Sequence, residues 1–179
     1  VFGLWIPFKA LVAQEMLELA WAESQARQSE ARPWPWADTW PVAKLDIPEQ
    51  GVSMIVLEGV HGESLAFGPG RVPGSEGPGA PVVLAGHRDT HFRHLQHLEP
   101  GDAVRLQGMD RQWRRYQVTA TRVVDSSRES LDTRSLAQDT LVLITCYPFD
   151  SLDASGTLRY VVEAKPAYGM EQIDTVAAL

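Results

Sequence analysis

After residue 41 the chain consists of short apolar runs separated by glycine and proline, and this pattern limits the fold more than any other feature. Residues 68–80 alone hold five glycines and three prolines, so we expect a loop there. Many short strands with such turns and little helix predict a mainly β fold, an antiparallel-rich barrel or sandwich. The runs with the length and apolar content of strands lie at 42–47, 52–57, 81–86, 103–107, 113–124, 139–146 and 158–164.

The first 26 residues are predicted to form a helix that is apolar at its start and amphipathic further on. Residues 1–13 carry a single charge, at Lys9, and the chain begins at Val1, so we expect an upstream membrane anchor to have been removed. Such a helix either continues from the anchor or packs on the folded body, and periodicity alone does not separate the two. The helix is expected to present Val12, Met16, Leu19 and Ala20 on one face and Gln14, Glu15, Glu18 and Gln25 on the other.

Residues 27–41 hold three prolines and three tryptophans and are predicted to be an extended connector, because proline forbids a regular helix. Trp34, Trp36 and Trp40 would be costly to leave in water. We therefore expect all three to anchor the connector and the helix 7–26 against the folded body. The body itself is predicted at 42–168, with a tail at 169–179.

Charge and cysteine content exclude several classes of protein. The net charge of −7 argues against nucleic acid as a partner, because phosphate binding needs a basic footprint. A chain of 179 residues with 44% apolar residues can bury a core without a disulfide or a metal. The single cysteine, Cys146, excludes an intrachain disulfide and a zinc site built on several cysteines.

Cys146 ends the apolar run 139–146 and precedes Tyr147 and Pro148. The end of a strand holds a side chain rigidly and leaves it accessible, which suits a nucleophile. A lone cysteine is more often a buried and inert structural residue. Its position alone therefore leaves both interpretations open.

The segment LAGHRDTHFRHLQHL at 84–98 holds four histidines. His87 is the strongest functional candidate because it directly follows the strand predicted at 81–86. His91, His94 and His97 belong to one or two helical turns expected at 91–98. Their spacing would also allow a metal site, but the segment has no HExxH motif and few carboxylates.

Arg159 lies 13 residues after Cys146, near the start of the strand predicted at 158–164. An arginine in a strand is commonly a solvated edge residue. The intervening residues 147–157 resemble a hairpin loop, which would place the two strands side by side. Neighbouring strands lie about 4.8 Å apart, so Arg159 could then reach a substrate bound at Cys146.

Taken together, these residues resemble the sortases, which are membrane-anchored cysteine transpeptidases of bacterial surfaces. The similarity rests on LAGHRDT at 84–90, on LITC at 143–146 followed by YPF, and on the spacing from Cys146 to Arg159. The details GHRDTHF and TCYPFD resemble sortases of classes D and E. The stretches WIPFKA at 5–10 and PWPWADTWPVA at 33–43 are most similar to the marine proteobacterial type of Gram-negative bacteria. One departure is Val142, which replaces the first threonine of the family's Thr-Leu-x-Thr-Cys motif.

The resemblance implies an eight-stranded β-barrel with an N-terminal helix that cleaves an LPxTG-like sorting signal between threonine and glycine. It implies His87, Cys146 and Arg159 as the catalytic set, with no metal and no cofactor. The expected partners are a surface or secreted protein that carries the signal at its C-terminus and an amine acceptor. The expected location is the inner membrane, held by a single N-terminal anchor, with the catalytic domain in the periplasm.

Three further residues are predicted to bind substrate. In sortases the connection that corresponds to residues 125–139 forms a wall of the signal groove, which points to Leu131 and Leu136. Thr145 is included because it precedes Cys146 in the motif.

Two other functions are compatible with the residues. A metal-dependent hydrolase could use His87, Asp89 and His91 and would not need Cys146. A tryptophan-rich barrel of the cell envelope could instead bind peptide or glycan without catalysis.

Overall fold

The computed structural model describes residues 2–75, 79–130, 135–153 and 155–167. Within them the helices are α1 (Phe2–Arg27) and α2 (Gly62–Leu65), with 3-10 turns η1 (Pro48–Gln50) and η2 (Arg93–His97). The strands are β1 (Pro41–Ile47), β2 (Val52–Glu58), β3 (Gly70–Arg71), β4 (Val82–Ala85), β5 (Ala103–Gln107), β6 (Trp113–Asp125), β7 (Leu141–Cys146) and β8 (Leu158–Pro166).

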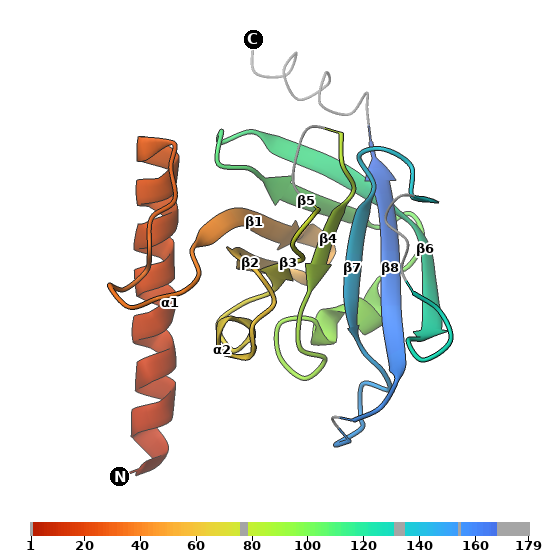
Figure 1. Ribbon diagram of the computed structural model, residues 1–179, viewed down its shortest axis with the longest axis horizontal. Helices are drawn as coiled ribbons and strands as arrows, with labels where there is room; N and C mark the ends of the chain where they lie inside the picture. The colour runs from red at the N-terminus through yellow and green to blue at the C-terminus, as the bar shows by residue number, and fades with distance from the viewer. Residues whose placement is uncertain (1, 76–78, 131–134, 154, 168–179) are drawn as a thin grey trace.

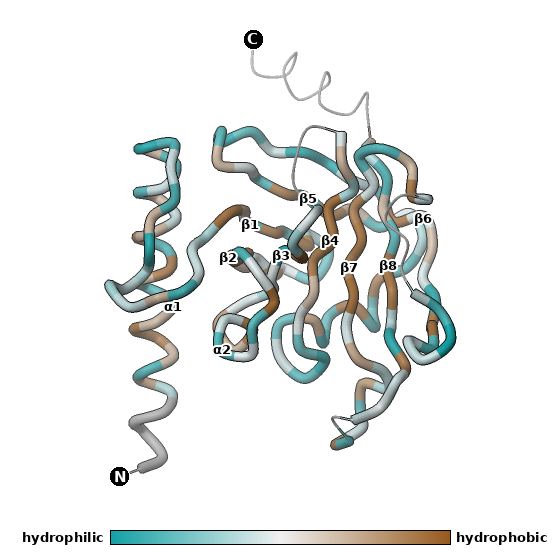
Figure 2. Tube along the Cα trace, in the orientation of Figure 1, coloured by the Kyte–Doolittle hydropathy of each residue, from teal (hydrophilic) through white to brown (hydrophobic). Residues whose placement is uncertain are grey.

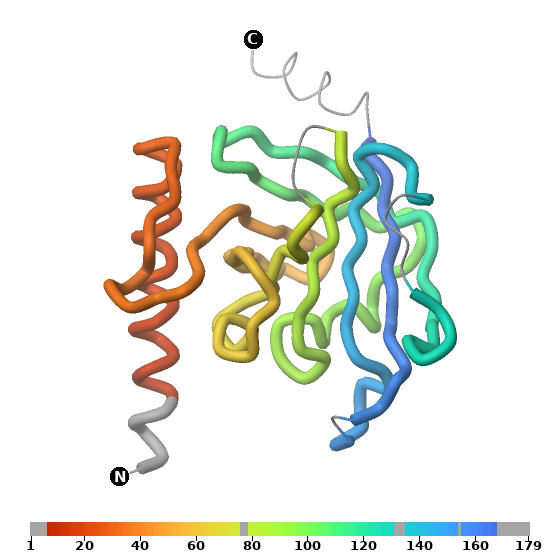
Figure 3. Tube along the Cα trace, viewed as in Figure 1, coloured from red at the N-terminus to blue at the C-terminus, as the bar shows by residue number. Residues whose placement is uncertain are grey.

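The eight strands form a closed barrel in the order β1-β2-β3-β4-β7-β8-β6-β5, which confirms the predicted fold class (Figure 1). The pairs β2–β3 and β4–β7 are parallel, and the other neighbours are antiparallel. The parallel pair β4–β7 joins segments that are far apart in sequence, as the trace in Figure 3 shows. This pairing brings the end of β4 to the end of β7.

Side chains of β7 alternate between the interior and the outer wall of the barrel, as strand geometry requires. Leu141 and Leu143 belong to the interior core, whereas Val142 and Ile144 belong to a separate cluster on the outside. Both β4 and β7 are therefore apolar along most of their length (Figure 2). We call this second group the outer-face cluster; it consists of Val72, Val83, Val124, Leu136, Val142, Ile144 and Val161.

The loop predicted at 68–80 contains one element that the sequence did not indicate. Gly70 and Arg71 form β3, which connects β2 to β4 in the barrel. A Cβ atom at Gly70 would lie 2.0 Å from the carbonyl oxygen of Gly59, so only glycine permits this approach. A strand of two residues is too short to show a periodic pattern, which explains why the loop prediction was wrong at this point.

The helix α1 stands beside the barrel (Figure 1) and contacts it at β1 and β2. Leu17 and Trp21 lie one turn apart and pack on Ile55 and Leu57 of β2; Trp21 is only 4% exposed. The predicted apolar face is wrong in three of its four members: Ala20 is buried, but Val12, Met16 and Leu19 are exposed. Apolar residues occur on several sides of α1, so periodicity could not select the side that packs. 

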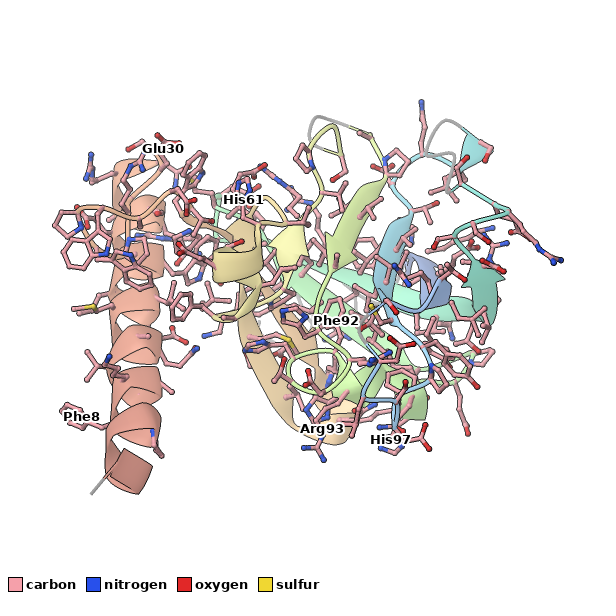
Figure 4. The ribbon with its side chains drawn as sticks, turned by 60° about the horizontal axis from the view of Figure 1, so that its bottom comes forward. Phe8, Glu30, His61, Phe92, Arg93 and His97 are labelled. Atoms are coloured by element: carbon pink, nitrogen blue, oxygen red, sulfur yellow. The ribbon has the colours of Figure 1, made fainter. Side chains whose placement is uncertain are left out.

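The exposed side of α1 continues to Phe8, which projects away from the barrel in Figure 4. Among the described residues, no helix combines the length and the apolar character that crossing a membrane would require.

Two of the three connector tryptophans pack as predicted. Trp34 meets Phe67 edge-on, with ring centroids 5.0 Å apart, and Trp40 packs against the barrel core. Trp36 is 83% exposed, so its predicted role as an anchor is wrong. The reason is a turn in which the Ala37 N–H donates to the Trp34 carbonyl at 3.1 Å, which buries Ala37 and leaves Trp36 outside.

Candidate active site

Cys146 and Arg159 are direct cross-strand partners in the antiparallel pair β7–β8. Cys146 shares its side of β7 with Val142 and Ile144, and Arg159 shares its side of β8 with Val161, so both face outward. Opposite side chains in such a pair lie about 5 Å apart at Cβ. The half-buried thiol and the guanidinium group are therefore held by the sheet itself rather than by a loop.

His87 reaches the same end of the barrel from β4. In the parallel pair β4–β7, Ala85 is the register partner of Ile144. The Gly86 N–H then donates to the Ile144 carbonyl at 3.2 Å, so the pairing continues past the end of the strand. One residue further along, His87 comes level with Cys146, and its side chain is exposed to solvent.

Thr145 connects the two strands at this point. Its hydroxyl donates to the Gly86 carbonyl at 2.6 Å, and the residue is only 4% exposed. In this structure Thr145 therefore fixes the backbone before His87 relative to Cys146. That it also contacts substrate stays a prediction.

Position 86 favours glycine, because the ring of Phe92 lies against its backbone. A Cβ atom at Gly86 would lie 2.8 Å from the ring of Phe92, which is fully buried (labelled in Figure 4). The Phe92 N–H donates to the His87 carbonyl at 3.0 Å. The buried ring and this hydrogen bond together fix the backbone of His87.

The loop between β7 and β8 places the Arg159 side chain. Arg159 Nη1 donates to the carbonyls of Gly156 at 2.7 Å and Leu158 at 2.9 Å. At the base of the loop the rings of Tyr147 and Tyr160 stack with centroids 6.1 Å apart, and Phe149 meets Tyr160 edge-on at 5.2 Å. The two Nη1 hydrogen bonds fix the guanidinium group of Arg159, and the ring contacts fix the base of the loop.

His91 lies close to the candidate site but in different surroundings. Burial lowers the pKa of His91, and the charges of His87 and His94 lower it further. Its Nδ1 atom is buried with no hydrogen-bond partner among the described residues. His91 is therefore neutral at neutral pH and adds no positive charge beside His87.

The metal-site alternative finds no support in the described part of the chain. There, no group of three or more histidine, cysteine, aspartate or glutamate side chains is arranged so that it could hold a metal ion. The set of His87, Asp89 and His91 thus does not converge on a single point.

A family model for the sortase domain matches residues 45–167, well over half of the chain. The chain belongs to the sortase family. Sortase D of Bacillus subtilis (strain 168) is 34% identical over 123 residues, which cover 68% of this chain and 61% of that relative. The match thus spans less than two thirds of that relative's length.

Two solved structures show that the fold is shared. A sortase D5 transpeptidase of Clostridium perfringens has a TM-score of 0.63 at 23% identity, covering 87% of this chain and 98% of that one. Sortase C of Clostridium perfringens, solved with the C-terminal cell wall sorting motif, has a TM-score of 0.60 at 18% identity, covering 89% of each chain.

In this sortase the outer-face cluster leads along β4 and β7 toward Cys146. Leu136, which was predicted to bind substrate, is half-buried against this cluster. Leu131 lies outside the described residues. Leu136 is a partly buried member of the outer-face cluster, which would suit a role in substrate specificity. That role stays a prediction.

A cavity of about 620 Å³ lies away from these residues, between α1, the connector and the segment after α2. Phe8, Met16, Trp34 and Phe67 are among its lining residues, and none of His87, Cys146 and Arg159 is. This cavity therefore lies apart from the candidate active site.

The structure adds residues that the sequence could not indicate. The side chain of Arg88 donates to the Asp153 carbonyl at 2.6 Å, although 65 positions separate the two residues. Gly86 and Phe92 are close in sequence, but no local pattern shows that the ring packs on the glycine. Only the GHRD context of Arg88 could have drawn attention to this part of the site.

Proposed function

We propose that this sortase is a cysteine transpeptidase that cleaves an LPxTG-like sorting signal between threonine and glycine. The observation that carries the proposal is the placement of Cys146 opposite Arg159, with His87 arriving from the strand beside them. A nucleophile, an imidazole that transfers protons and a cation that stabilises an oxyanion together suit acyl transfer.

In the first half-reaction the Cys146 thiolate attacks the carbonyl carbon of the threonine. Arg159 holds the oxygen of the tetrahedral intermediate, since its planar charged group offers fixed donors. When the intermediate collapses, the C–N bond breaks and protonated His87 gives its proton to the departing glycine amine. The products are a thioester on Cys146 and the released glycine-containing peptide.

In the second half-reaction an amine attacks the thioester carbonyl. Neutral His87 takes the proton of the attacking amine, the C–S bond breaks, and Cys146 returns as thiolate beside the protonated imidazole. Water in place of the amine gives hydrolysis. The cycle uses only this chain's side chains, the signal peptide and the acceptor.

The half-buried members of the outer-face cluster near Cys146, Ile144 and Leu136, are proposed to contact the apolar part of the signal. The cluster leads to Cys146 along β4 and β7. The Clostridium perfringens sortase C structure, which contains a cell wall sorting motif, supports this choice of substrate class by relationship. The proposed partner is a surface or secreted protein with such a signal at its C-terminus.

We also propose that the protein is of the marine proteobacterial type and works in the periplasm, attached to the inner membrane by an N-terminal anchor. The support is the resemblance of residues 5–10 and 33–43 and the single charge in residues 1–13. Accessibility of the barrel to added protease, in spheroplasts of a Gram-negative host expressing the full-length protein, tests the location.

Intact-mass spectrometry tests the reaction. The protein is incubated with LPxTG-like peptides and a panel of amines, and Cys146→Ala serves as the matched control. We expect an adduct equal to the peptide up to its threonine, transferred to an amine, and neither event in the control. A thiol alkylator should stop turnover and a chelator should not. Turnover by Cys146→Ala would rule out the proposed mechanism.

A further inference from the structure

Arg88, the residue after His87, links the two loops that border the candidate active site. Its guanidinium Nη2 donates to the carbonyl oxygen of Asp153 at 2.6 Å. Arg88 lies in the connection between β4 and η2, whereas Asp153 lies in the loop between β7 and β8. The hydrogen bond therefore joins the segment that carries His87 to the loop that runs from Cys146 to Arg159.

Asp153 is held in that loop by hydrogen bonds to neighbouring residues. Its Oδ1 atom accepts from the Ser155 hydroxyl at 2.6 Å and from the Ser155 N–H at 2.9 Å, and its own N–H donates to Ser151 Oγ at 3.1 Å. The Ser155 hydrogen bonds lower the pKa of Asp153, and the positive charge of Arg88 contributes. The turn is thus stabilised around a charged carboxylate at neutral pH.

The same loop holds Arg159 at its other side. Gly156, one residue beyond Ser155, accepts from Arg159 Nη1 at 2.7 Å. At the base, the Tyr147 N–H donates to the Leu158 carbonyl at 3.1 Å. The strands and the aromatic rings fix the base of the loop, and the Arg88 bond acts on its tip.

We propose that Arg88 is a positioning residue, which holds the His87 segment and the β7–β8 loop in one fixed arrangement around Cys146. The proposal rests on the proposed transpeptidase function for the roles of His87 and Arg159. Among the described residues of the tip, the other hydrogen bonds of Asp153 stay within its own turn. Without the Arg88 bond we therefore expect the tip to shift, together with the Gly156 carbonyl that accepts from Arg159. A charged donor on a carbonyl makes a strong and directional hydrogen bond, which suits this task.

The test compares Arg88→Ala with Arg88→Lys and with the control Arg93→Ala. Arg93 lies in η2 near the same end of the barrel, is exposed, and its replacement removes the same charge (Figure 4). We expect Arg88→Ala to lower kcat by roughly ten- to a hundredfold with KM little changed, because misplaced groups slow the chemical step. Arg88→Lys should recover part of kcat, since one N–H donor remains, and Arg93→Ala should match the wild type.

Two readouts do not depend on substrate. Hydrogen–deuterium exchange of the loop 147–157 should be faster in Arg88→Ala than in Arg93→Ala. The pH profile of Cys146 alkylation by iodoacetamide should move to higher pH in Arg88→Ala, because a displaced His87 stabilises the thiolate less. If Arg88→Ala changed neither the exchange rate of the loop nor the pH profile of Cys146 alkylation, the proposal would be overturned. A higher KM at constant kcat would also overturn it, because Arg88 would then be a substrate-binding residue.

Failure of the proposed transpeptidase function would give a different experimental result. In that case the wild-type protein forms no acyl-enzyme with any peptide, while loop exchange and the alkylation profile still decide whether Arg88 positions the site.

Discussion

Cys146, the last residue of β7, lies directly opposite Arg159 on β8, in a register that runs without a bulge from Leu141 and Ala164. The two candidate catalytic side chains are therefore held by a continuous antiparallel pair. His87 has no such partner, because β4 ends two residues earlier. Its position depends instead on the contacts of Gly86, Thr145 and Phe92.

Replacing Arg159 by lysine should lower kcat/KM by about 10²-fold, comparable to the loss of one oxyanion donor. Lysine keeps the positive charge but loses the planar fork, and with it the two bonds from Nη1 to the loop carbonyls. Steady-state kinetics with an LPxTG-like peptide measure the change. Arg122→Lys is the matched control, since Arg122 is exposed on β6. Near wild-type kinetics for Arg159→Lys would mean that Arg159 is a strand-edge residue without a catalytic role.

Substitution of Leu136 by alanine should change peptide preference more than it changes the reactivity of the thiol. Leu136 is half-buried on the outer-face cluster and is not a neighbour of Cys146 in sequence. The measurement is kcat/KM across a library of sorting pentapeptides, beside the rate of Cys146 alkylation. Leu19, which is 69% exposed on α1 and lies apart from the candidate site, supplies the control variant Leu19→Ala. Identical preferences in the two variants would place the signal-binding surface elsewhere.

Gly86→Ala should both destabilise the protein and impair catalysis. The added Cβ atom would lie 2.8 Å from the fully buried Phe92 ring, so the ring or the backbone would have to shift. Overpacking of this kind costs about 1–3 kcal/mol. Thermal unfolding and kcat are the measurements. Gly62→Ala is the control, because a Cβ atom there meets nothing within 4 Å. A Gly86→Ala variant that behaves like Gly62→Ala would contradict the contact.

The lowered pKa of His91 predicts a loss of stability in mild acid. In the unfolded chain His91 titrates near its ordinary value of 6.5, above its pKa in the folded state. Between the two values the unfolded state binds more protons, so the free energy of unfolding falls as the pH falls below about 6.5. His91→Phe should therefore lose less melting temperature than the wild type between about pH 7 and pH 5.

The control for this pH effect is His97→Phe, since His97 is exposed in η2 (Figure 4). It should follow the wild-type curve. Parallel curves for all three proteins would show that His91 does not titrate differently on folding.

Long apolar strands and the residues at their ends could be predicted from the sequence, because a buried strand appears as a run of apolar residues bounded by turn residues. Cys146 and Arg159 were placed in this way, and their pairing followed from the hairpin character of 147–157. β3 was missed because two residues carry no period. The packing side of α1 was misassigned because apolar residues occur around the whole helix. The Arg88–Asp153 hydrogen bond is a tertiary contact and leaves no trace in either segment.

The contact between α1 and the barrel leads to the last prediction, which concerns stability. Leu17 is fully buried between α1 and β2, where it packs with Trp21, Ile55 and Leu57. Two hydrogen bonds add to this contact. Gln14 of α1 donates to the Phe67 carbonyl at 3.1 Å, and Gln28, the residue after α1, donates to the Met109 carbonyl at 2.9 Å. A loosely tethered helix would not require such a set of contacts.

Leu17→Ala should therefore destabilise the whole protein by about 2–5 kcal/mol, the usual range for a buried leucine. For a domain of this size that corresponds to a fall in melting temperature of roughly 4–20 °C. Leu19→Ala is the matched control on the same helix, because Leu19 is 69% exposed and should shift the melting temperature little. Loss of the α1 contact would also uncover Ile55 and Leu57 on the outside of β2, so Leu17→Ala should aggregate on heating before the control does. Equal melting temperatures for the two variants in detergent-free buffer would mean that α1 is a tether whose packing contributes nothing to the stability of the barrel.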